Sequence, residues 1–129
     1  MKNLDYKNVV GIAALLVHAA KIDELYSNQE KDLIKKFIKS YLKEGDENLI
    51  LKEAEEIEHN SNQLISFTNI IKKNNEEVKS NIIENLWKII ISDNSIDQYE
   101  SNLMRRICGL IYFPDKMSAE IKLKIMNDK

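Results

Sequence analysis

The sequence has little of what stabilises small secreted proteins or β-rich folds. Its single cysteine, Cys108, excludes an internal disulfide and a cysteine-based zinc site. One proline and three glycines in 129 residues are too few for a chain rich in tight turns. The longest apolar run, from Val9 to Ala20, covers about 12 residues, whereas a membrane-spanning helix takes about 20. We therefore expect long regular elements and no membrane span.

An excess of charge of one sign is also missing. The formal net charge is −2, without the basic excess that nucleic-acid-binding domains usually carry, so we expect no nucleic acid as a partner. The first residues, MKNLDYKN, lack the organisation of a signal peptide, and we expect a cytoplasmic protein. The sequence shows no nucleophile–base pattern, phosphate loop or nucleotide fingerprint, and we expect no enzymatic activity.

Apolar residues recur with a period of about 3.6 residues, and no long segment alternates with period two. This pattern predicts an all-α fold of about seven helices. Ser27 and Glu30 have the spacing of a capping box, Gly45 is expected to end the second helix, and Pro114 is expected to end the sixth. Six apolar side chains are predicted to be buried together: Leu16, Phe37, Leu86, Trp87, Ile90 and Ile107.

The chain matches itself at an offset of about 70 residues. Asp23 falls on Asp93 and Glu30 falls on Glu100, and no gap is needed across about thirty positions. Apolar positions match apolar positions on both sides of the polar turn. The match predicts that one structural unit, a helix, an acidic turn and a capped helix, occurs twice.

The two copies cover residues 9–42 and 79–112 of a single domain spanning residues 1–129. One such unit cannot cover its own apolar first helix, but two units can cover each other. We therefore expect two pseudo-symmetric helix–turn–helix repeats packed around two central apolar helices.

Two segments then resemble a known family. Residues 23–30, and SDNSIDQYESNLMRR over residues 92–106, are similar to the two acidic motifs of the TerB-like tellurite-resistance family. That family includes the N-terminal domain of a membrane-anchored DnaJ-type co-chaperone. ISFTNII (residues 65–71) through NEEVKSNIIENLWKIIISD resembles a small stand-alone bacterial branch of it, and the resemblance covers nearly the whole chain.

The resemblance implies an all-α fold, an association with tellurite or other chemical stress, and a divalent metal at the acidic positions. The turns depart from the usual Ala-Asp-Gly of the family, because Glu24 follows Asp23 and Asn94 follows Asp93. Asn accepts the left-handed conformation of a Gly more readily than Glu does, so the first turn is expected to differ in shape.

Asp23, Glu30, Asp93 and Glu100 form the candidate site, with two interpretations. In one, Glu30 and Glu100 close capping boxes while the aspartates bond to turn amides. In the other, the four carboxylates hold calcium, magnesium or manganese. A calcium ion takes about 6–8 oxygen ligands, more than one turn supplies, so both turns would have to converge and water would complete the shell.

Two functions follow from these alternatives. The first is a stress-associated domain that binds a divalent cation. The second is a non-enzymatic interaction module that docks an unknown protein partner through its acidic stretch, residues 44–58, or its basic stretch, residues 31–43. His18 is expected at a helix surface or contact edge and His59 in solvent. The sequence favours no oligomeric state.

Overall fold

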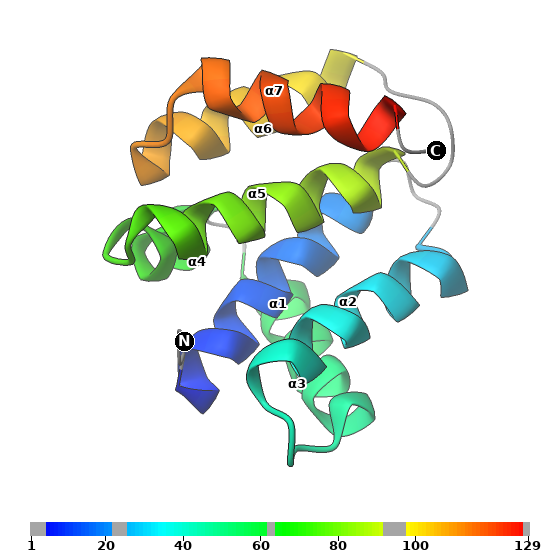
Figure 1. Cartoon of the computed structure of the whole chain (residues 1–129). Coiled ribbons are helices and arrows are strands. Elements are labelled where there is room, and N and C mark those ends of the chain that lie inside the picture. The colour runs from blue at the N-terminus through cyan, green and yellow to red at the C-terminus, as the bar shows by residue number, and fades with distance from the viewer. Residues whose placement is uncertain (1–4, 22–25, 62–63, 92–97, 128–129) are drawn as a thin grey trace.

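A computed structural model describes residues 5–21, 26–61, 64–91 and 98–127. These residues form seven helices and no strand, and 85% of them are helical (Figure 1). The predicted all-α fold is confirmed. In chain order the helices are α1 (Tyr6–Ala20), α2 (Asn28–Tyr41), α3 (Glu47–Asn60), α4 (Leu64–Lys72), α5 (Glu76–Ile91), α6 (Gln98–Ile111) and α7 (Asp115–Asn127).

Short polar side chains cap the helix starts. At the start of α1, Asp5 Oδ1 accepts the amide of Asn8 at 2.8 Å. Asp46 caps α3 in the same way, and Asn75 Oδ1 accepts the amide of Val78 at 2.9 Å at the start of α5. Each cap satisfies a backbone N–H that has no partner within the helix.

The prediction that Gly45 ends the second helix is wrong. Helix α2 stops at Tyr41, with Leu42 as its C-cap, and no glycine of the described residues has a positive φ. A Cβ at Gly45 would lie 2.8 Å from Cδ1 of Ile50. The glycine therefore permits Ile50 of α3 to approach the loop closely, and the sequence alone does not reveal that contact.

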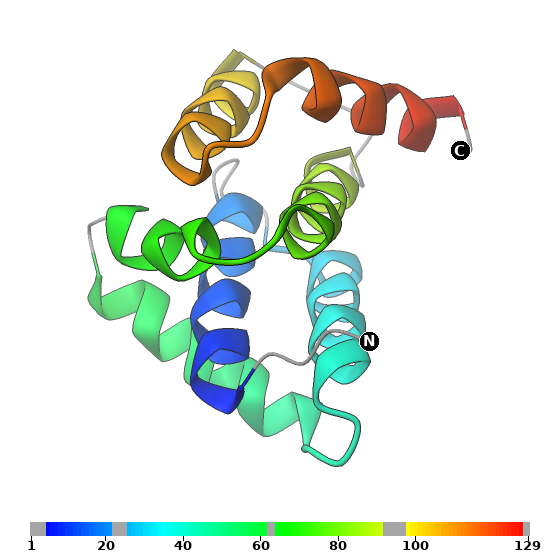
Figure 2. The ribbon, with the colours of Figure 1, turned by 60° about the vertical axis from the view of Figure 1, so that its left-hand side comes forward.

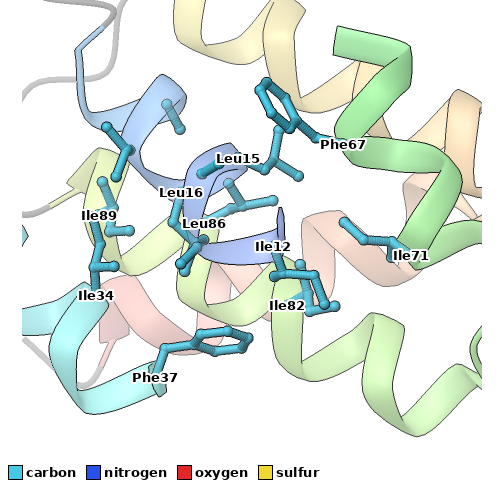
Figure 3. Packing of buried hydrophobic residues seen from close by; sticks show 14 of the residues in the cluster. Ile12, Leu15, Leu16, Ile34, Phe37, Phe67, Ile71, Ile82, Leu86 and Ile89 are labelled. Carbon is cyan, nitrogen blue, oxygen red and sulfur yellow. The ribbon is translucent and has the colours of Figure 1, made fainter. Parts of the chain in front are cut away.

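Helix α1 lies at the centre of the core. Every residue from Val9 to Val17 is buried. Side chains of α2, α4 and α5 converge on Ile12, Leu15 and Leu16 of α1 (Figure 3). The six residues predicted to form the core, Leu16, Phe37, Leu86, Trp87, Ile90 and Ile107, are all buried in one cluster, as expected. No helix among the described residues is long and apolar enough to cross a membrane.

The helix bounds follow the internal repeat. Gln98 and Ile111, the ends of α6, each lie 70 positions after Asn28 and Tyr41, the ends of α2. Helix α1 packs against α2 and α3, and α5 packs against α6 and α7. The two apolar helices α1 and α5 also contact each other, but α6 covers α5 less extensively than α2 covers α1. Superposition of the two halves stays a prediction.

Candidate functional site

The four helix ends that flank the two acidic turns point the same way. Helix α1 ends at Ala20 before the first turn, and α5 ends at Ile91 before the second. In Figure 2 these two ends, and the starts of α2 and α6, are each the upper end of their helix. The three helices α1, α2 and α5 are also in mutual contact. The described ends of α1 and α5 and the described starts of α2 and α6 therefore face the same side in this view.

The structure describes the side chain of only one predicted site residue, Glu30. Asp23, Asp93 and the side chain of Glu100 lie outside the described residues. Glu30 is buried, with 3% of its surface exposed, and its Oε1 accepts the amide of Ser27 at 2.8 Å. In return, Ser27 Oγ accepts the amide of Glu30 at 3.1 Å. The capping box predicted at the start of α2 is thus present.

A complete metal centre is not found within the part of the chain that the structure describes. No group of three or more His, Cys, Asp or Glu side chains there is arranged to hold a metal ion. Cys108 is buried, and burial raises the pKa of its thiol. The metal interpretation consequently depends on the aspartates of the two turns.

A polar cluster lies where the end of α1 meets α3. The ammonium of Lys21 lies 2.9 Å from Glu58 Oε1, and Nδ1 of His18 lies 3.2 Å from Glu58 Oε2. Burial alone would raise the pKa of the Glu58 carboxyl, but its hydrogen bonds with Lys21 and His18 outweigh burial and hold the pKa below its usual value. The pairing positions α3 against the end of α1, beside the first turn.

A second carboxylate of α3 reaches the other side of that turn. The hydroxyl of Tyr26 donates to Oε2 of Glu55 at 2.6 Å. Burial, this hydrogen bond and the charges of Glu55, Glu30 and Glu58 raise the pKa of the Tyr26 hydroxyl well above its usual value. Glu55 and Glu58 thereby attach α3 to the residues directly before and directly after the first turn, Lys21 and Tyr26.

The basic stretch of α2 is partly engaged within the molecule. Lys31 Nζ lies 4.8 Å from the centre of the Tyr26 ring. Lys39 Nζ donates to the carbonyl of Gly45 at 3.3 Å and lies 3.7 Å from Glu47 Oε1. These contacts leave less of the basic stretch available to a partner than the sequence pattern suggested.

The family model described as "Tellurite resistance protein TerB" matches residues 10–123, from within α1 to within α7. The chain belongs to the TerB family. The match spans both helix–turn–helix units and the acidic turn of each, which confirms the resemblance that the two motifs indicated. Neither the curated proteins nor the solved structures include a significant match to this TerB chain.

Sequence reasoning missed the Glu58 cluster of the TerB domain. Its members lie about 40 positions apart, and neither His18 nor Lys21 belongs to a recognisable motif. The sequence carried one signal for this cluster, which is the spacing of its residues along each helix. Glu55 and Glu58 are three residues apart on one face of a helix, as are His18 and Lys21, and such pairs can face each other between packed helices. His18 lies half-buried at this helix contact and His59 is exposed, as predicted.

Proposed function

We propose that this TerB domain acts without catalysis in the response to tellurite or another chemical stress, and that its two acidic turns together bind one divalent cation. The cation is calcium, magnesium or manganese, and its proposed ligands are Asp23, Glu30, Asp93 and Glu100. The observation that carries the proposal is the common direction of the four helix ends that flank the turns (Figure 2). Membership of the TerB family adds the association with tellurite resistance.

Electrostatics explains why such turns would bind a cation. Carboxylates held near one another raise each other's pKa, and a divalent cation relieves that repulsion. A carboxylate offers about four acceptor positions, so the capping box at Glu30 is compatible with a contact to a cation. Glu30 also holds the first turn of α2 in place through Ser27, which would fix the position of the neighbouring ligands.

Thermal unfolding in the presence of each metal tests the proposal. Bound calcium, magnesium or manganese should raise the melting temperature with the logarithm of the metal concentration. Asp93→Asn should abolish this response yet cost little stability without metal, because Asn can still bond to turn amides. Asp32→Asn is the matched control, since Asp32 is exposed on α2 and its loss changes the net charge by the same amount. It should respond to metal as the parent protein does.

The capping interpretation predicts a different result. Ser27→Ala should cost about 1 kcal/mol of stability by removing the N-cap, and no metal should change the melting temperature. A melting temperature that rises equally in Asp93→Asn and in the parent protein would also refute a site shared by the two turns.

A second function, docking of a protein partner, is supported by the surface of α3. Leu49 is 65% exposed and Ile57 is 39% exposed, two turns apart on one face of this acidic helix. Between them lies Glu53, whose carboxylate accepts the hydroxyl of Tyr6, itself 50% exposed. Exposed apolar side chains among carboxylates suit a basic amphipathic helix. We infer that the acidic face of α3, rather than the basic face of α2, would bind such a partner.

Binding of a synthetic Lys- and Leu-rich helical peptide, followed by fluorescence anisotropy, tests this second function. The double variant Leu49→Gln, Ile57→Gln should weaken binding, whereas Lys52→Gln, at an exposed position on the same helix, should not. Weakening by added salt is also expected, because the carboxylates attract the peptide. Equal affinity in both variants would remove α3 as the docking face.

A further inference from the structure

A cleft lies between α5, α6 and α7. It has a volume of about 270 Å³. Its apolar wall consists of Trp87, Met104 and Ala119. Trp87 is 4% exposed, and its indole N–H donates to Oγ of the buried Ser118 at 3.0 Å. This hydrogen bond joins the Trp87 side chain of α5 to Ser118 of α7.

Three charged side chains line the same cleft. Arg105 comes from α6, and Lys122 and Asp115 come from α7. None of the three takes part in an ion pair with another described residue. The ammonium of Lys122 lies 5.1 Å from the centre of the Trp87 ring, so one cation sits directly beside the apolar wall. Among the described residues that line the cleft, two cations stand against one carboxylate.

We propose that this cleft binds a small organic carboxylate, with its apolar body against Trp87 and its carboxylate between Arg105 and Lys122. A guanidinium and an ammonium both form charge-assisted hydrogen bonds with a carboxylate. The volume is below the range of about 300–1,000 Å³ that is usual for drug-sized ligands, so only a small molecule fits. Asp115 repels a carboxylate and would limit its affinity. Binding in this cleft does not require a cation at the acidic turns.

The chain's single tryptophan makes the proposal directly measurable. Trp87 is the only tryptophan in the sequence, so all tryptophan fluorescence of the protein comes from a residue that lines this cleft. Hexanoate serves as the probe, with hexanamide as its neutral counterpart and acetate as the head group without an apolar body. Hexanoate should change the Trp87 emission in a saturable way. Hexanamide and acetate should bind at least about tenfold more weakly, the scale of a lost charge-assisted hydrogen bond or of a few lost methylene groups.

Variants distinguish binding in the cleft from binding elsewhere. Lys122→Gln and Arg105→Gln should each weaken hexanoate binding about tenfold. Lys124→Gln removes an exposed charge from the same helix outside the cleft and should leave binding unchanged. Asp115→Asn should tighten binding about two- to threefold, since an exposed like charge is removed. Ala119→Leu should block the cleft without changing any charge.

Several results would overturn the proposal. One is a Trp87 emission that hexanoate does not change. Another is binding of hexanamide as tight as that of hexanoate, which would show that the cations play no part. A third is weaker hexanoate binding in Asp115→Asn, or equal binding in Lys122→Gln and Lys124→Gln. The thermal unfolding of each variant should match that of the parent protein, which ensures that an altered affinity reflects the cleft.

Discussion

Lys21 and Glu58 form an ion pair between the end of α1 and α3, with 2.9 Å between Nζ and Oε1. Only 12% of the Glu58 side chain is exposed, whereas 38% of the Lys21 side chain is. Partial burial raises the pKa of this carboxylate, and its hydrogen bonds with Lys21 and His18 outweigh burial and lower the pKa below its usual value. Loss of either the charge or the carboxylate should therefore weaken the attachment of α3.

Glu58→Gln is expected to lower the free energy of unfolding by about 1 kcal/mol at neutral pH. The loss is small because Lys21 and His18, the partners of Glu58, are partly exposed. The pKa of Glu58 in the folded protein is below the usual value of 4.5. The contribution of the Glu58 carboxylate to stability is therefore complete above about pH 4.5. It is lost as the pH falls through the pKa that Glu58 has in the folded protein. Urea unfolding of both proteins across the acid range should show the difference shrinking at low pH. Glu56→Gln, at an exposed position on the same helix, should show no such difference.

Tyr26→Phe is expected to cost about 1 kcal/mol at neutral pH, because it removes the hydrogen bond to Glu55. The pKa of Tyr26 in the folded protein is above the usual 10.0. As the pH rises, the unfolded chain therefore loses the proton of the Tyr26 hydroxyl before the folded protein does. The contribution of Tyr26 to stability declines as the pH rises above about 10. Urea unfolding up to about pH 11 should show a steeper decline for the parent protein than for Tyr26→Phe. Removal of the exposed hydroxyl of Tyr112 should not change stability at neutral pH.

The helices and the core could be predicted from the sequence because their signals are local. Ser27 and Glu30 meet across three residues, so their spacing alone indicates the capping box. Leu86 and Ile90 repeat on one helical face, which indicates burial whatever they contact. Local spacing of this kind needs no knowledge of the tertiary arrangement.

The contacts between distant segments could not be predicted in this way. Glu58 binds His18 across about 40 positions, and nothing in either segment specifies the other. The cleft beside Trp87 depends on where α7 crosses α5, which one sequence does not reveal. Convergence of Asp23 and Asp93 on a cation likewise depends on the packing of both halves, and it stays a prediction.

Leu86→Ala is expected to destabilise the fold by about 2–5 kcal/mol, because Leu86 is fully buried where α5 meets α1 (Figure 3). Lys88→Ala, two residues further along the same helix, should cost no more than about 0.5 kcal/mol. Lys88 is exposed, and its partner Glu84 lies on the same helix at 3.1 Å. Thermal and urea unfolding of the two variants measure the difference. Equal losses of stability would contradict the place of Leu86 in the core.

The end of α6 provides the last prediction. Tyr112 has a φ of 60°, the left-handed conformation that glycine adopts without strain, and the amide of Phe113 donates to the carbonyl of Cys108 at 2.9 Å. A side chain in this conformation costs about 1 kcal/mol, so Tyr112→Gly should stabilise the protein by up to that amount. Tyr112→Phe keeps the Cβ and the ring that lies against Lys72, and it should bring no gain. Urea unfolding of both variants decides the matter, and a glycine variant less stable than the phenylalanine variant would show that the ring contributes more than the backbone strain costs.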